Sequence, residues 1–343
     1  MKRFILLFSL LLVLALAVAC GGTAEETVEE VAPTTEAVVE APTDVVAEEV
    51  AAPGDVGDQL YVFLPKSLDN PYWDDCRKGM EDLAAELGVQ AEFLGPDTAD
   101  AAKQVGIFES VIARRPAGIA VSPNDPATVT AAIATAMEAG IPVFAWDADA
   151  PESERIAYIG TNNVNAGRTA GEELAKAIGG AGQVAILHGS LTAANANERV
   201  QGFEEAMANY PDIEIVAIEP TEDSLATALA KAEQLLQAYP ELKAFYGVTG
   251  SGVPGASGAV KQANKCGEVQ VIGFDVVPQG IEAMREGCAQ VLISQRPYGM
   301  TQMTLQTMFD LHNSGTQVSE EFIDTGVEVV YPDTLEAFLE TPH

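Results

Sequence analysis

The sequence predicts an α/β fold of two doubly wound, parallel-sheet (Rossmann-like) lobes facing each other across a cleft. From residue 59 onward, short β-rich runs alternate with amphipathic helical runs. This alternation indicates βαβ units with right-handed crossovers. Ten such strands are many for one sheet, and the polar run GTNNVNAGR at 160–168 follows the first five. We therefore expect a second sheet to begin near this run.

The predicted strands are mostly continuous apolar runs, as expected of parallel strands covered on both faces. They lie at 60–65, 89–94, 118–123, 141–147, 155–161, 183–189, 213–220, 242–248, 269–275 and 289–295. The helical runs between them have clear boundaries. In DPATVTAAIATAMEAG, for example, a helix can start on Asp125 and end at Gly140, before Pro142. The pattern predicts crossover helices on both faces of each sheet.

The first 19 residues have the features of a signal peptide. The positive MKR segment precedes the apolar FILLFSLLLVLALAVA, which is short for a membrane-spanning helix and ends in small residues before Cys20. The segment LAVAC resembles a lipoprotein box, in which Cys20 is acylated and becomes the mature N-terminus. The alternative is an ordinary secretory signal that happens to contain a cysteine. Both predict export, and the first predicts a lipid anchor in the cell membrane facing the periplasm or the cell exterior.

Residues 20–58 are predicted to be a disordered acidic tether. Residues 21–58 contain 11 acidic residues and no Lys or Arg. Such a segment cannot bury enough apolar surface to offset its ordering entropy. The whole chain has a formal net charge of -33, which argues against nucleic acid as a partner because phosphates would be repelled. A solvated acidic surface is the simpler explanation of this charge.

The cysteines of the folded part do not have the spacing of a metal site, because no CxxC motif or histidine pair accompanies them. We expect no metal. Cys266 and Cys288 each precede a predicted strand. If those strands are parallel neighbours, a disulfide between the two cysteines is geometrically possible, and it suits an oxidising compartment. Cys76 is expected to be a buried apolar residue on the first helix.

The ends of the predicted strands carry amides, carboxylates and aromatic rings. These residues are Asn70, Tyr72, Trp73, Asn124, Asp125, Asp147, Asp149, Asn195, Asn197, Thr249, Asp275 and Gln295. Ligands of open α/β sheets bind beyond the carboxyl ends of the strands. Carboxylates and amides bind hydroxyls, and aromatic faces stack on the C–H faces of a sugar ring. The set favours a neutral polyhydroxylated ligand. It lacks a Ser-His-Asp order or an HExxH motif, so we predict no enzyme.

Several of these residues have a structural alternative. Asn124 and Asp147 could cap the helices that follow them, and Trp73 could belong to the core, as we expect of Trp146. His188 is interpreted as a satisfied polar residue rather than a base. GSGVPG at 250–255 has the spacing of a dinucleotide-binding motif, with Asp275 following at a suitable distance. Because it lies deep in an exported chain, we interpret it as a helix-entry loop beside the cleft and expect no cofactor.

Together these segments resemble the type I periplasmic binding proteins of the ribose-binding-like group, the sugar-capturing subunits of ABC importers. The resemblance covers about 59–330 and rests on DNPYW, AGIPVFAWD, GTNNVNAGRTAGEELA, NERVQGFEEAM, VIGFD and ISQRPYGM. The same fold forms the ligand cores of LacI-type repressors, but no helix-turn-helix precedes it here. The resemblance implies a lipid-anchored solute-binding protein, expected to be a monomer, that delivers its ligand to ABC permease subunits.

The resemblance also implies ligand-binding roles for particular residues. They are Asn70, Tyr72, Trp73, Asp147, Asn197, Thr249, Asp275 and Gln295. Thr249 stands where an asparagine is usual. Two further departures matter: Ala148 and Asn197 stand where ribose and galactose binders have arginine. Because two bidentate donors are missing at these positions, the resemblance leaves the identity of the sugar open.

The family's fold has three crossovers between the lobes, implied here near Thr161, Gln295-Arg296 and Asp324–Gly326. The first lobe is then 59–161 plus 296–324, and the second is 162–295 plus 325–343. Two other functions stay open. The same fold could serve a chemoreceptor or a signalling kinase as a sugar sensor, or it could bind a different small polar ligand.

Overall fold

The computed structural model describes residues 56–340. The predicted signal peptide, Cys20 and the tether up to residue 55 lie outside the described residues. Val56–Asp58, which we counted as part of the tether, form a 3-10 turn, η1. The backbone N–H of Gln59 donates to the Val56 carbonyl at 3.1 Å, and Gln90 Nε2 donates to the Gly57 carbonyl at 3.0 Å. These two bonds link Val56–Asp58 to Gln59 and Gln90.

The first lobe is built on a six-stranded sheet in the order β11-β5-β4-β3-β1-β2, and all of its strand pairs are parallel. Its strands are β1 (Leu60–Leu64), β2 (Gln90–Phe93), β3 (Gly118–Val121), β4 (Val143–Trp146), β5 (Tyr158–Gly160) and β11 (Phe322–Asp324). The strand β11 comes from the C-terminal part of the chain.

The second lobe is built on another six-stranded sheet, in the order β12-β10-β9-β8-β6-β7. Only the β10–β12 pair is antiparallel. Its strands are β6 (Ala181–His188), β7 (Asp212–Pro220), β8 (Leu242–Gly247), β9 (Gln270–Phe274), β10 (Val291–Ser294) and β12 (Glu328–Val330). All ten predicted strands occur, and the predicted class of two parallel-sheet lobes is confirmed.

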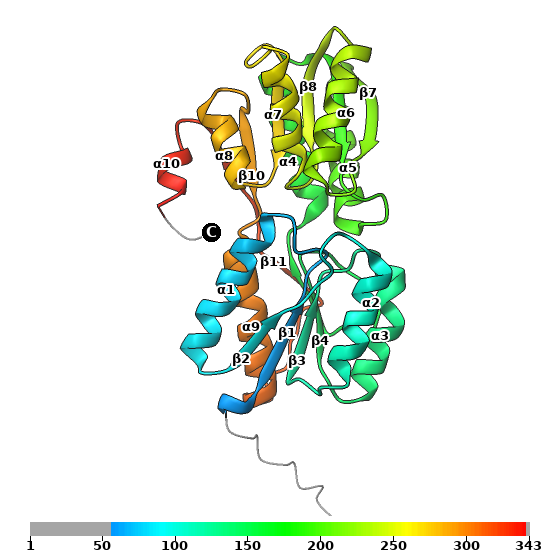
Figure 1. Ribbon diagram of the computed structural model, residues 1–343, viewed down its shortest axis with the longest axis vertical. Helices are drawn as coiled ribbons and strands as arrows, with labels where there is room; N and C mark the ends of the chain where they lie inside the picture. The colour runs from blue at the N-terminus through cyan, green and yellow to red at the C-terminus, as the bar shows by residue number, and fades with distance from the viewer. Residues whose placement is uncertain (1–55, 341–343) are drawn as a thin grey trace, which may run out of the picture. The chain divides into compact units, whose positions relative to one another are not determined.

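Helices cover both faces of each sheet (Figure 1). In the first lobe, α1 (Tyr72–Leu87) and α9 (Pro297–Ser314) pack together on one face, and α2 (Ala101–Ile112) and α3 (Pro126–Glu138) on the other. In the second lobe, α4 (Asn163–Ala177) and α5 (Ala194–Met207) cover one face. The other face is covered by α6 (Leu225–Ala238), α7 (Gly252–Gln262) and α8 (Pro278–Arg285), with α10 (Leu335–Phe338) beside α8. No helix within residues 56–340 is long and apolar enough to cross a membrane.

The chain passes from one sheet to the other after β5, after β10 and after β11. In both lobes, the carboxyl ends of the parallel strands carry the side chains that meet between the sheets. For example, Lys66 follows β1, Asp147 follows β4 and Asp275 follows β9. The parallel arrangement therefore gathers residues that are far apart in the sequence.

Two glycines bring α4 and α5 unusually close together. A Cβ atom at Gly202 would lie 1.9 Å from the Val164 carbonyl oxygen, and one at Gly167 would lie 2.0 Å from that of Arg199. Any side chain at either position would force the helices apart. The contact fixes the backbone of Arg199, a residue whose side chain enters the site described below.

Cys266 and Cys288 form a disulfide with a Cα–Cα distance of 4.4 Å. It ties the residues before β9 to those before β10, which are parallel neighbours in the second sheet. Cys76 is buried on α1, as predicted.

Reduction of this disulfide is expected to lower the free energy of unfolding by ~3 kcal/mol, because it frees a closed loop in the unfolded chain. Chemical denaturation with and without reductant measures the difference, and a thiol titration verifies reduction. A Cys266→Ala/Cys288→Ala double variant is the control and should not respond to reductant. An unchanged midpoint in the reduced wild type would contradict the prediction.

Candidate functional site

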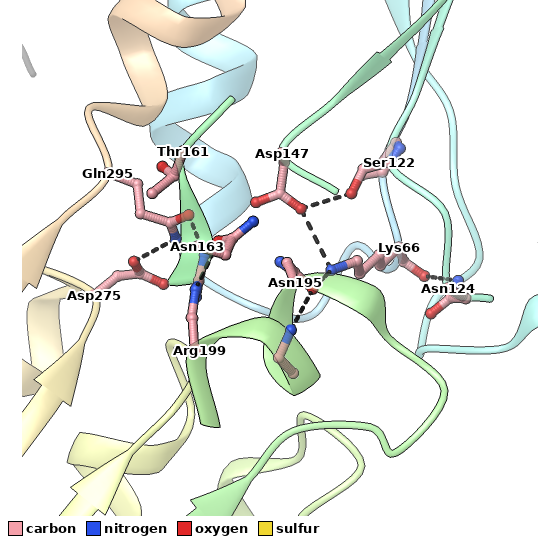
Figure 2. A network of polar contacts seen from close by, with 12 residues as sticks. Lys66, Ser122, Asn124, Asp147, Thr161, Asn163, Asn195, Arg199, Asp275 and Gln295 are labelled. Atoms are coloured by element: carbon pink, nitrogen blue, oxygen red, sulfur yellow. Dashed lines mark hydrogen bonds and ion pairs between the residues drawn. The ribbon is translucent and has the colours of Figure 1, made fainter. Parts of the chain in front are cut away.

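Most of the predicted ligand-binding residues meet in a cavity between the carboxyl ends of the two sheets. The cavity is lined by Lys66, Ser67, Asn70, Tyr72, Trp73, Asp147, Asn195, Arg199, Asp223, Thr249, Gly250, Asp275 and Gln295. Its volume is about 20 Å³, which is room for a single water molecule. Polar side chains fill the rest of the space by bonding to one another (Figure 2). A larger ligand must replace some of these bonds.

Asp147 is the buried carboxylate of the first lobe. Ser122 Oγ donates to its Oδ2 at 2.6 Å. Its backbone has φ 61°, a conformation that residues other than glycine rarely adopt. Hydrogen bonds hold that backbone, because its N–H donates to the Ile159 carbonyl and its own carbonyl accepts from the Tyr158 hydroxyl. Such local strain is typical of functional positions.

Lys66 joins the two lobes inside the cavity (Figure 2). Its Nζ lies 3.4 Å from Asp147 Oδ2 in the first lobe. The same Nζ donates to Asn195 Oδ1, at the start of α5 in the second lobe, at 2.7 Å. The side chain is almost fully buried, so its charge is compensated by these partners rather than by water.

Arg199 is the buried cation of the second lobe. Its Nε donates to Asn163 Oδ1 at 3.0 Å, and an Nη atom donates to the Val248 carbonyl at 3.0 Å. Its other Nη donates to Gln295 Oε1. The guanidinium carbon lies 4.1 Å from the centre of the Phe274 ring. Planar stacking with several fixed acceptors is a setting that suits arginine and not lysine.

Asp275 completes the network. Gln295 Nε2 donates to its Oδ1 at 2.7 Å, so Arg199, Gln295 and Asp275 form a chain of polar contacts. Burial raises the pKa of Asp275 to about 7, although Arg199 and Gln295 favour its charged form. The carboxyl therefore titrates near neutral pH.

Tyr72 and Trp73 form the aromatic wall. Both are buried, and their ring centres lie 4.9 Å apart in an edge-to-face arrangement. Trp73 also contacts Trp146, which is fully buried in the core as predicted. Trp73 thus belongs both to the core and to the cavity lining, so the two interpretations of the sequence are compatible.

Seven of the eight predicted ligand-binding residues line the cavity, and Asn197 does not. Asn197 is exposed, its Oδ1 lies 3.1 Å from His188 Nε2, and its Nδ2 donates to the Leu191 carbonyl. Its neighbours Asn195 and Arg199 take its place. The reason is helical geometry, since residues four apart share a helix face and the residue midway between them points away.

The sequence interpretation missed two lining residues that carry much of the polarity, Lys66 and Arg199, and it named Asn195 at a strand end without including it in the ligand-binding set. Lys66 follows β1 after a single proline. The rule that ligands bind beyond the carboxyl ends of parallel strands, called the strand-end rule below, could therefore have identified it. Ala148 and Asn197 stand where related binders have arginine, but two other cations, Lys66 and Arg199, line the cavity.

The capping alternatives do not hold. Asp125, not Asn124, caps α3, since its side chain accepts from the Ala127 N–H. Asn124 instead donates to the Lys66 carbonyl at 2.8 Å. Asp147 precedes a β-bridge rather than a helix.

The cavity pairs three carboxylates with two cations and several amides beside an aromatic wall. This chemistry suits a neutral ligand with several hydroxyls, which can donate to carboxylates and accept from Lys, Arg and Asn. Among residues 56–340, no group of three or more His, Cys, Asp or Glu side chains is placed to hold a metal ion.

Comparison with known proteins identifies the family. The periplasmic binding protein domain family matches residues 61–316. The D-allose-binding periplasmic protein of Escherichia coli is 30% identical over 264 residues, which is 74% of this chain and 85% of that protein. The chain therefore belongs to the periplasmic binding protein family. The type I, ribose-binding-like fold predicted from the sequence is confirmed.

Solved structures agree with this assignment. A solute-binding protein of an ABC transporter from Burkholderia graminis, in complex with D-arabinose, is 35% identical with a TM-score of 0.79, covering 82% of this chain and 98% of that one. The glucose-galactose binding protein GanP from Geobacillus stearothermophilus is 34% identical with a TM-score of 0.76, covering 80% and 98%. The relatives are binding proteins of sugar transport.

Proposed function

We propose that this protein is the extracytoplasmic solute-binding subunit of an ABC importer and that it captures a monosaccharide or a similar polyol. The observation that carries the proposal is the set of buried carboxylates, cations and aromatic rings from both lobes around one cavity. The relatives include an allose-binding protein, a ribose-binding protein and a solute-binding protein in complex with D-arabinose, which supports a sugar as the ligand. The bound sugar then supplies contacts to both lobes, which favours the closed arrangement recognised by the permease.

We further propose a signal peptide over 1–19, a lipid anchor on Cys20 and an acidic tether that links the anchor to a monomeric folded body. In this proposal, the first lobe comprises 59–161 plus 296–324 and the second 162–295 plus 325–343. No covalent chemistry and no cofactor is involved. The protein faces the periplasm or the cell exterior, where its ligand arrives.

The proposed function is tested by thermal unfolding with a panel of monosaccharides, including D-allose, D-arabinose, D-ribose, D-galactose and D-glucose. A ligand at a hundred times its Kd raises the free energy of unfolding by ~2.7 kcal/mol. We expect one or a few related sugars to raise the Tm. A response to amino acids or nucleosides and to none of the sugars would refute the assignment of a sugar.

The two asparagines at the start of α5 offer a matched pair of variants. Asn195→Ala is expected to weaken sugar binding roughly tenfold or more, because it removes a buried amide and leaves Lys66 Nζ without its 2.7 Å acceptor. Asn197→Ala should leave the affinity within about twofold, since the side chain lies outside the cavity. Isothermal titration calorimetry measures both, and equal losses would contradict our placement of the site.

A further inference from the structure

A second hollow adjoins the cavity on the side of Asn70. Its volume is about 270 Å³, close to the lower end of small-ligand pockets at roughly 300 Å³. The hollow and the cavity share Asn70, Asp223 and Gly250 as lining residues, so these residues lie on the boundary between them. A Cβ at Gly250 would lie 2.9 Å from Asn70 Oδ1 and 3.3 Å from Asp275 Oδ2. Because Gly250 has no side chain, little material lies between the cavity and the hollow at this position.

Polar atoms at this hollow lack partners among the described residues. The Ser251 hydroxyl has no hydrogen-bond partner although the residue is only 5% exposed, and Asp223 Oδ1 is also unpartnered. Buried polar atoms are nearly always paired in proteins, so unpaired ones indicate a missing partner. Ser251 lies at the start of α7, where it makes no capping bond through its side chain.

The loop that supplies Asp223 is held in an unusual backbone conformation. Glu222 and Asp223 have φ values of 52° and 53°, so two successive residues other than glycine adopt the left-handed region. This conformation costs of order 1 kcal/mol for each residue and concentrates at functional sites. It places Asp223 on the boundary between the cavity and the hollow.

The charge of the hollow restricts its occupant. Asp69 and Asp223 line it, and no Lys or Arg does. An anionic group such as a phosphate would be repelled by these carboxylates. Hydroxyl groups, in contrast, can donate to the carboxylates and accept from Ser251 and from Gln279 on α8. Leu225, which is 44% exposed at the start of α6, offers an apolar surface to the face of a ring.

We propose that this hollow is an outer subsite for a second sugar ring or a comparable neutral hydroxylated substituent, so that the physiological ligand is a glycoside or a disaccharide. This inference rests on the proposed function, because it places the first ring in the cavity. One ring lies between the aromatic wall and the carboxylates, and the glycosidic bond passes Asn70 and Gly250 to reach the hollow.

The test compares the affinities of free sugars with those of their glycosides on the full folded protein. The probes are D-galactose, D-glucose, D-allose, D-arabinose and D-ribose, their methyl α- and β-glycosides, lactose and cellobiose. We expect a glycoside or a disaccharide to bind at least as tightly as its parent sugar. If a monosaccharide binds but every glycoside of it is rejected, the outer subsite is refuted while the proposed function stands. If no saccharide binds, both are refuted.

Two variants localise the effect. Leu225→Ala and Gln279→Ala lie in the hollow and outside the cavity, and both side chains are exposed, so the fold should be retained. Each should weaken the disaccharide or glycoside roughly fivefold and leave the free sugar unchanged. Met303→Ala is the control, since Met303 is an apolar residue on α9, 41% exposed, that lines neither space. Equal effects on both ligands, or the same effect in the control, would overturn the proposal.

Discussion

Replacing Arg199 with methionine is expected to abolish sugar binding, with an affinity loss of roughly a hundredfold or more, and to lower the free energy of unfolding by ~3 kcal/mol. Methionine fills much of the volume but donates no hydrogen bond. Asn163 Oδ1, the Val248 carbonyl and Gln295 Oε1 then lose a buried donor, and Asp275 loses its nearby cation. Calorimetric titration with the stabilising sugar and chemical denaturation measure the two effects.

A control from the neighbouring helix separates the site from general packing. Arg168→Met on α4 removes an exposed arginine whose Nη lies 2.6 Å from Glu205, and it should cost less than ~1 kcal/mol and leave binding intact. Arg199→Lys keeps the charge but loses the planar set of guanidinium donors. Its free energy of unfolding should therefore be higher than that of the methionine variant, while its sugar binding should still be weak. Sugar affinity within threefold of wild type in Arg199→Met would show that Arg199 does not serve the site.

Replacing Asp275 with asparagine is expected to have opposite effects on binding and on stability. Binding should weaken roughly a hundredfold, because a buried charged acceptor of sugar hydroxyls is lost. Stability above pH 7 should increase, because the pKa of Asp275 is raised from 3.8 to about 7 in the folded state. The folded state binds the carboxyl proton of Asp275 more tightly than the unfolded chain does. The stability that this proton contributes is therefore complete below pH 3.8 and disappears as the pH rises through 7.

Denaturation of both proteins at several pH values measures this effect. Within the range from pH 5 to pH 8, the two proteins should differ least near pH 5, where Asp275 is neutral in the folded wild type. At pH 8 the variant should be more stable by about 2–4 kcal/mol. Wild-type affinity should fall below pH 7 as the carboxyl becomes protonated, while the weak affinity of the variant should not follow this titration. A stability difference that stays constant from pH 5 to 8 would contradict the raised pKa.

Most of the strands were predictable because they are buried on both faces and read as continuous apolar runs. The ten strands found in this way are all present. The strands β11 and β12 are absent from the predicted set, and each has only three residues. Their strand character comes from pairing with β5 and β10, a tertiary interaction that leaves no local pattern.

The strand-end rule located most of the site, since parallel strands gather their carboxyl ends whatever lies between them in the sequence. It failed on α5, where the side chains lie on a helix. A position shifted by two residues points to nearly the opposite side of a helix, so choosing Asn197 instead of Arg199 moved the prediction from the cavity to the surface. The contacts of Lys66 with both lobes could not be predicted, because the sequence alone does not show how far a flexible side chain reaches.

The position of β11 and α9 in the chain has a consequence for synthesis. Both belong to the first lobe, yet they follow every strand of the second sheet except β12. A ribosome must therefore make the polypeptide as far as residue 324 before the first sheet has all its strands, and as far as residue 330 before the second does. Neither core can be completed before these late segments have been made. A truncation before residue 297 should consequently damage the first lobe, although it leaves every residue from 56 to 161 in place.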